Sequence, residues 1–90
     1  MKAYSITYDL KSPGRDYNNL YEAIKSSGKW WHYLESTWIV TTNETSQQIW
    51  DRLAKNIDNN DRLLIIEVKN NCYGWLPKDA WDWIRQNVPE

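Results

Sequence analysis

Residues 29–42 have the sequence KWWHYLESTWIVTT, and this stretch decides the fold of the chain. It predicts two short strands that meet near Glu35 and Ser36, because aromatic and β-branched side chains fit a pleated, half-buried surface. Side chains alternate between the two faces of a strand, so the register of this hairpin decides which aromatic rings share a face. The register is therefore the first structural question that the chain poses.

A turn at residues 35–36 places Tyr33 opposite Trp38 and Trp31 opposite Val40. One face of the hairpin then carries Trp31, Tyr33, Trp38 and Val40, and the other carries Trp30, His32, Leu34, Thr37, Ile39 and Thr41. Neither turn residue is a strong tight-hairpin former, so a one-residue slip or a bulge stays open as an alternative. Either change moves part of one strand to the opposite face.

The segment before the hairpin predicts a strand and then a helix. Residues 3–9 alternate in polarity, which is typical of a strand with one buried face. The members of that buried face are Tyr4, Ile6 and Tyr8. Ser-Pro-Gly at residues 12–14 ends the strand with a turn, and Asp16 can cap a helix over residues 17–27 that stops at Gly28.

The segment after the hairpin predicts a helix, a strand and a last helix. Thr45 or Ser46 can cap the first of these helices, which continues through Ile57. Residues 62–69 form a short apolar strand, and a helical tail follows over about residues 75–88, with Trp75, Trp81 and Trp83 expected to clamp it against the sheet or a partner.

This order of elements predicts an α+β fold of the ferredoxin-like, βαββαβ type. Such a fold has a four-stranded antiparallel sheet with the first and third strands central and two helices on one face, here with an extra C-terminal helix. We expect one domain over residues 1–90, with its core in about residues 3–69 and the helical tail outside it. The second sheet face is expected to be covered by a partner subunit, a ligand or that tail.

Composition restricts the classes of function. The chain has 11 basic and 12 acidic residues and a net charge of −1, so nucleic-acid binding would need a local patch or dimer symmetry. Cys72 is the only cysteine, which excludes an internal disulfide and fits a reducing compartment. No apolar run approaches the roughly twenty residues of a membrane span, and no signal-peptide pattern is present. We expect a cytoplasmic protein with no membrane partner.

Several short motifs resemble the small bacterial proteins of the SinR family, which is distinct from the helix-turn-helix regulator of the same name. The motifs are Tyr8-Asp9-Leu10, Pro13-Gly14, Asp16-Tyr17, Trp30-Trp31-His32, Ser36-Thr37-Trp38-Ile39-Val40 and Asp61. The wider resemblance is to the CRISPR-associated Cas two and VapD proteins. It implies a ferredoxin-like homodimer that associates with RNA or DNA and cleaves phosphodiesters with Mg²⁺ or Mn²⁺, with Asp9 in the position of the family's acidic residue and Ser36 in that of its serine.

Asp9 is the first candidate for catalysis and metal binding. A single carboxylate is a poor Mg²⁺ site, although two-fold symmetry could bring two copies together. The alternative is that Asp9 caps the turn with Ser12 or pairs with Lys11 or Arg15. Those two basic residues are candidates for phosphate contacts, and the alternative for them is surface pairing with Asp16.

His32, Ser36 and Trp30 complete the candidate site. In the register above His32 shares a face with Asp9, which would permit general acid or base catalysis; the alternative is a hydrogen-bonded structural histidine. Trp30 is a candidate for stacking on a base. A function of another class stays open: a non-catalytic interaction module that binds a partner protein or a small nucleotide-like ligand, which the balanced charge favours.

Overall fold

Four strands form one antiparallel sheet in the computed structural model, which describes residues 1–90. They are β1 (Lys2–Asp9), β2 (Lys29–Leu34), β3 (Thr37–Thr42) and β4 (Arg62–Val68). The strand order is β2-β3-β1-β4, so β1 and β3 are central, as the sequence predicts, and β2 and β4 are the edges. The predicted α+β class with a four-stranded antiparallel sheet is confirmed.

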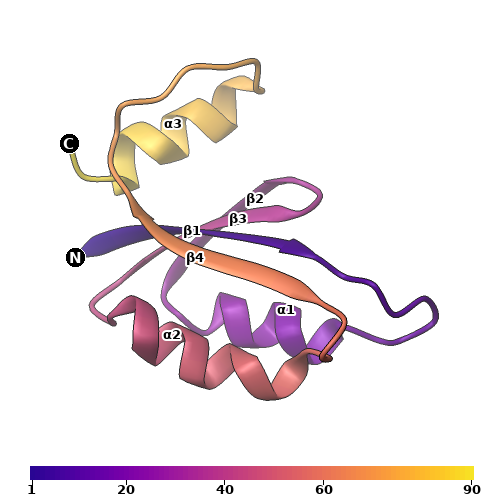
Figure 1. Cartoon of the computed structure of the whole chain (residues 1–90). Helices are drawn as coiled ribbons and strands as arrows, with labels where there is room; N and C mark the ends of the chain where they lie inside the picture. Colours follow the sequence, from indigo (N-terminus) through magenta and orange to yellow (C-terminus); the bar gives the residue numbers. More distant parts are fainter.

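Helices lie on both faces of this sheet: α1 (Asn18–Lys25), α2 (Ser46–Leu53) and α3 (Lys78–Asn87), with the 3₁₀ turn η1 (Ala54–Asn56) after α2. Figure 1 shows α1 and α2 on one side of the sheet and α3 on the other. Thr45 caps α2, because its hydroxyl accepts from the Gln48 N–H at 3.1 Å while the Gln48 side chain accepts from the Thr45 N–H at 2.8 Å. None of the helices has the length and apolar character needed to span a membrane.

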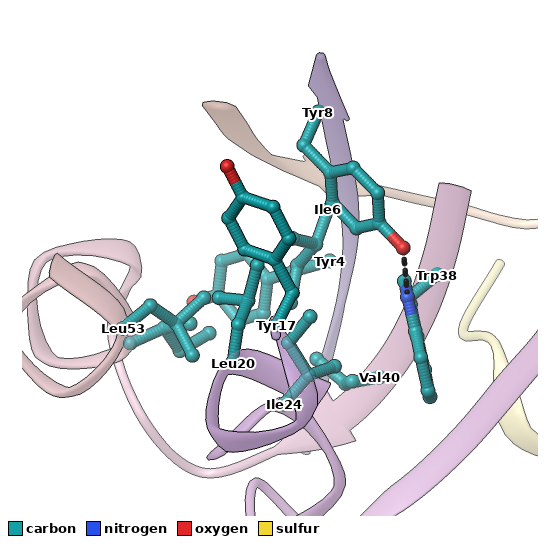
Figure 2. Packing of buried hydrophobic residues seen from close by; sticks show 10 residues of the cluster. Tyr4, Ile6, Tyr8, Tyr17, Leu20, Ile24, Trp38, Val40 and Leu53 are labelled. Atoms are coloured by element: carbon teal, nitrogen blue, oxygen red, sulfur yellow. Dashed lines mark hydrogen bonds between the residues drawn. The ribbon is translucent and has the colours of Figure 1, made fainter. Parts of the chain in front are cut away.

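The larger core lies between the sheet and helices α1 and α2 (Figure 2). Its buried members are Tyr4, Ile6, Tyr8, Tyr17, Leu20, Ile24, Trp38, Val40, Ile49 and Leu53. Trp38 donates its indole N–H to the Tyr8 hydroxyl at 3.0 Å, and that hydroxyl donates to the Glu35 carbonyl oxygen at 3.2 Å. These bonds satisfy the polar atoms that the two aromatic side chains carry into the core.

A smaller core lies on the other face, under α3. It consists of Ala3, Trp31, Ala80, Ile84 and Val88. Trp31 is only 2% exposed and donates its indole N–H to the Ala80 carbonyl oxygen at 3.1 Å. The helical tail therefore covers part of the second sheet face itself, which is one of the occupants that the sequence predicts for that face.

A bulge in β2 changes the predicted register of the hairpin. The turn lies at residues 35–36 as predicted, and Leu34 pairs with Thr37. Farther from the turn Trp31 pairs with Ile39 rather than Val40, because the register shifts by one residue between Trp31 and Leu34. The alternative of a bulge, which the weak turn residues left open, is the one that the structure adopts.

The bulge separates side chains that the simple register places together. Trp31 points to α3, whereas Trp38 and Val40 point to α1 and α2. Tyr33 also lies on the α3 face, where its hydroxyl donates to the Asp79 carboxylate at 3.1 Å. The prediction that Trp31, Tyr33, Trp38 and Val40 share one face is therefore wrong, and each face of the sheet has its own buried tryptophan.

Candidate functional site

Asp9 ends β1 with an exposed side chain opposite Arg62 of β4. Its carboxylate makes no hydrogen bond and no ion pair within the chain. The predicted local partners bind elsewhere: the Ser12 hydroxyl donates to Asp58 at 3.3 Å, and the Arg15 guanidinium pairs with Asp58 at 3.4 Å. The capping alternative for Asp9 is therefore wrong, and this carboxylate is available to a group from outside the chain.

Arg62 is the neighbour of Asp9 that the sequence does not reveal. The two residues pair directly across β1 and β4, so both side chains lie on the face opposite α1 and α2. One guanidinium N–H donates to the Asp61 carbonyl oxygen at 3.2 Å, and the side chain is otherwise exposed. A shallow hollow of about 280 Å³ includes both residues together with Thr7 and Leu64. Asp9 and Arg62 are neighbours because of the register in which β1 pairs with β4. Sequence periodicity does not determine that register.

Ser36 lies close to Asp9, as the sequence predicts. The Ser36 carbonyl oxygen accepts from the Tyr8 N–H at 3.1 Å, which holds the hairpin turn against the end of β1. Asp9, Ser36 and Glu35 line a second shallow hollow of about 400 Å³. An exposed carboxylate, a hydroxyl and a guanidinium thus lie around the end of β1.

His32 lies apart from Asp9. Its ring stacks on Trp38, with ring centroids 3.7 Å apart and an interplanar angle of 13°. Its Nε2 lies 3.1 Å from the Glu35 carbonyl oxygen. Because Trp38 faces α1 and α2, His32 lies on that side of the sheet, and the prediction that it shares a face with Asp9 is wrong. The bulge is the physical reason, and the structural alternative describes the geometry of this histidine.

Trp30 also lies on the opposite face of the sheet from Asp9. Its ring centroid lies 5.4 Å from that of Trp38, so it packs on the face of α1 and α2. The Lys25 ammonium lies 5.1 Å from the Trp30 ring centroid in a cation–π contact. Trp30 is 42% exposed, so its position is that of a partly covered side chain beside α1 and away from the carboxylate.

Lys11 and Arg15 lie in the loop that follows β1. Arg15 pairs with Asp58 at 3.4 Å, so the alternative that it pairs with Asp16 is wrong. Asp16 instead accepts from the Asn18 N–H at 2.9 Å at the start of α1. The Lys11 side chain is exposed and forms no ion pair, and it is the loop's free cation nearest in sequence to Asp9.

Asp61 holds that loop in place. Its side chain is 6% exposed, and it accepts from the Lys11 N–H at 2.7 Å, the Asp58 N–H at 2.8 Å and the Tyr17 hydroxyl at 2.8 Å. Burial alone would raise the pKa of Asp61, but the two backbone N–H bonds, the Tyr17 hydroxyl and the Arg15 charge together lower this pKa below its usual range. A buried carboxylate therefore joins the loop after β1 to the turn before β4.

One chain does not provide a metal site. No group of three or more His, Cys, Asp and Glu side chains is placed to hold an ion. Mg²⁺ requires near-octahedral oxygen ligands, of which one or two are usually protein carboxylates. Asp9 by itself is not such a ligand set, so a metal would need a ligand from outside the chain.

No protein-family model and no solved structure matches the chain. The end of β1 carries an unpaired carboxylate at Asp9, a cation at Arg62 and a hydroxyl at Ser36. An exposed carboxylate beside a guanidinium can bind a group that carries both a cation and an anion, or a phosphate with its counterion.

Proposed function

We propose that this chain is a nucleic-acid-associated homodimer resembling the Cas two and VapD proteins, with Asp9 as its functional carboxylate. The observation that carries the proposal is that Asp9 is exposed at the end of β1 and has no partner in its own chain. Arg62, directly across the strand pair, supplies a planar guanidinium of the type that binds phosphate. A phosphodiester held by Arg62 would lie next to the Asp9 carboxylate.

We also propose that the fold is ferredoxin-like. The order β1–α1–β2–β3–α2–β4 and the strand order β2-β3-β1-β4 support this assignment. The placement of α1 and α2 together on one face supports it as well (Figure 1). Helix α3 is then an addition to that fold, and it occupies sheet surface that a partner would otherwise reach.

Dimerisation bears directly on the proposed metal requirement. Because one chain lacks a sufficient ligand set, Mg²⁺ or Mn²⁺ fits only if a two-fold axis brings a second Asp9 close to the first. The net charge of −1 gives RNA and DNA no general attraction to the chain. The exposed Lys11 and Arg62 near Asp9 are the local cations on which nucleic-acid binding would depend.

The test is cleavage of labelled single-stranded RNA and duplex DNA by purified protein, with Mg²⁺ or Mn²⁺ and with a chelator. We expect cleavage by the wild type and none by Asp9→Asn. Asp51→Asn is the matched control, because Asp51 is an exposed carboxylate on α2, away from the end of β1. If the wild type cuts nothing, or if Asp9→Asn cuts as well as Asp51→Asn, the catalytic part of the proposal is wrong.

A salt titration of binding tests association separately from cleavage. The logarithm of the binding constant falls linearly with the logarithm of salt concentration, and each phosphate contact that is lost makes this slope less steep by about 0.9 for duplex DNA. Arg62→Gln should therefore weaken binding to all sequences and make the salt dependence less steep by the amount expected for about one phosphate contact. Absence of binding at low ionic strength would remove the nucleic-acid proposal altogether.

The second candidate function is a non-catalytic interaction module. The specific observation in its favour is exposed apolar surface: Tyr73 and Trp75 are fully exposed, and Leu64 and Ile66 are more than half exposed. Wild-type protein that neither binds nor cuts nucleic acid, yet associates through these residues, would identify the chain as a module of this class.

A further inference from the structure

We infer that a second copy of this chain docks on the part of the sheet that α3 leaves uncovered, and that Trp75 of each copy enters an apolar cavity of the other. This inference rests on the homodimer of the proposed function and names its interface. Three features of one chain support it: an uncharged row across the sheet with exposed leucines at its ends, a pair of exposed aromatic rings and a cavity of suitable size.

The row of uncharged side chains crosses all four strands on the α3 side of the sheet, with a leucine at each end and two threonines between them. Leu64 of β4 pairs with Thr7 of β1, Thr7 pairs with Thr37 of β3, and Thr37 pairs with Leu34 of β2. Leu64 is 58% exposed and Leu34 is 48% exposed, and Ile66 beside them is 52% exposed. Since α3 covers Trp31 and Ala3 but leaves this row open, the sheet presents to solvent an uncharged strip that is apolar at both ends. The hydroxyls of Thr7 and Thr37 lie 3.5 Å apart in its centre.

The exposed rings belong to the connection between β4 and α3, which runs from residue 69 to residue 77. In Figure 1 this orange segment leaves the end of β4 and runs alongside α3 to the start of the helix. Tyr73 and Trp75 show essentially their whole side-chain surface to solvent, at 102% and 99%. The prediction that Trp75 clamps the tail onto the sheet of its own chain is wrong, and the partner alternative is the one that fits this exposure.

The cavity lies between the sheet, the connection and α3, and has a volume of about 270 Å³. Ten of its fourteen lining residues are hydrophobic, including Leu34 and Ile39 of the sheet and Trp81 and Ile84 of α3. An apolar cavity of about 150 Å³ in another protein holds a benzene molecule. A volume of about 270 Å³ is therefore sufficient for an indole ring, and the apolar lining suits it.

A two-fold dimer needs a surface that is complementary to itself, so the projection and the recess must both belong to one chain. This chain carries Trp75 as the projection and the 270 Å³ cavity as the recess. Each exposed aromatic side chain can bury about 150–250 Å², so Tyr73 and Trp75 of two copies supply about 600–1,000 Å². A stable interface buries about 1,200–2,000 Å² in total, and the remaining area would have to come from the row and from Ile66 in both copies.

Charge does not oppose this association. The net charge of each copy is −1, so two copies repel each other only weakly. No charged side chain belongs to the row formed by Leu64, Thr7, Thr37 and Leu34. The Asp9–Arg62 pair lies two residues farther along β1 and β4 than Thr7 and Leu64, on the same face of the sheet.

The test is the oligomeric state of the full chain without nucleic acid, measured by sedimentation velocity and by light scattering over a wide range of concentration. We expect a concentration-dependent dimer. Trp75→Ala and Leu64→Lys should each raise the dimer dissociation constant by about thirtyfold or more, which is typical of a hot-spot residue. Trp50→Ala is the matched control, because Trp50 is a partly exposed tryptophan on α2, on the other side of the sheet.

Thermal unfolding verifies that these variants fold, which is expected because Trp75 makes no packing contact that its loss could disturb. A wild type that stays monomeric, or a Trp75→Ala dimer as stable as that of Trp50→Ala, would overturn the inference. The nucleic-acid assays report independently. If the dimer depends on Trp75 but does not bind RNA or DNA, the interface is supported and the proposed function is wrong. If the protein cleaves nucleic acid as a dimer whose dissociation constant does not change in Trp75→Ala, the proposed function is supported and the interface is wrong.

Discussion

Replacement of Asp61 by Asn should destabilise the fold strongly although it changes almost no volume. The carboxylate is buried and accepts from the Lys11 N–H, the Asp58 N–H and the Tyr17 hydroxyl. Lys11 donates to one carboxylate oxygen and Asp58 donates to the other. An Asn side chain keeps one oxygen, so its NH₂ group must face one of the two backbone donors.

The magnitude follows from these contacts. A buried donor left without an acceptor costs about 1–3 kcal/mol, and hydrogen bonds to a charged acceptor contribute about 1.5–3 kcal/mol each, compared with about 1 kcal/mol for neutral ones. We expect Asp61→Asn to lower the free energy of unfolding by about 3 kcal/mol. For a domain of this length that corresponds to a fall in Tm of about 12–24 °C. Such a loss is a large fraction of the roughly 5–15 kcal/mol that stabilises a typical domain.

The destabilisation caused by Asp61→Asn should depend on pH in a definite direction. The pKa of Asp61 is lower in the folded chain than the ordinary value of 3.8, so the charged form stabilises the fold. This stabilisation is fully present above the ordinary pKa and is lost as the pH falls through the lowered pKa of the folded chain. The difference in unfolding free energy between wild type and Asp61→Asn should therefore be constant near neutral pH and shrink below about pH 3.8.

The assay is urea unfolding followed by tryptophan fluorescence, at neutral pH and at several acidic pH values. Asp51→Asn is the control for the same chemical change at an exposed position, and it should stay within about 0.5 kcal/mol of wild type. A loss below about 1 kcal/mol for Asp61→Asn at neutral pH would refute the reasoning. A loss that stays the same at every pH would show that the charge of Asp61 is not the cause.

Two further substitutions test backbone geometry and capping. Gly28 has φ of +149°, and a Cβ built there would lie 2.4 Å from the Thr41 carbonyl oxygen, so Gly28→Ala should cost about 2–4 kcal/mol in urea unfolding. Gly14→Ala, at φ +81° with open space around the new Cβ, should cost only about 1–2 kcal/mol, and an equal cost at both positions would exclude the steric explanation. Thr45→Ala removes the capping box with Gln48 and should cost about 1 kcal/mol and lower helicity by circular dichroism, whereas an unchanged unfolding curve would show that the cap does not stabilise α2.

Local patterns were sufficient to predict the elements and their class. Alternation in residues 3–9 identifies β1, and the Thr45 cap identifies the start of α2. Helix boundaries were less accurate: the predicted helix over residues 17–27 is α1 over Asn18–Lys25, and the tail predicted to begin at residue 75 becomes helical at Lys78. The later start of α3 arises because Pro77 takes an extended backbone as the N-cap of the helix. For α1 the difference is at the ends, where Tyr17 and Ser26 are the N-cap and C-cap residues.

The sequence restricts the hairpin register to a few alternatives but does not decide among them. Both a plain pairing and a bulge satisfy the aromatic and β-branched preferences of residues 29–42. The deciding interactions are long-range: the Trp31 indole donates to Ala80 of α3, and the Tyr33 hydroxyl donates to Asp79. The bulge allows both side chains to face α3 while Trp38 stays in the main core. The sequence does not reveal this requirement, because it does not show that α3 packs on this face of the sheet.

The same dependence on long-range contacts explains which site residues the sequence revealed. Asp9 and Ser36 could be predicted together because the resemblance to the Cas two and VapD proteins implies an acidic residue at the end of the first strand and a serine at the start of the third. The structure places both at one hollow. Arg62 joins them only through the register of β1 with β4, and His32 leaves them only through the bulge. A single added residue in β2 therefore places the one histidine on the opposite face from Asp9. Any chemistry at Asp9 must then use Arg62, solvent or a second copy of the chain as its partner, and the dimer interface and the function can be tested with the same set of variants.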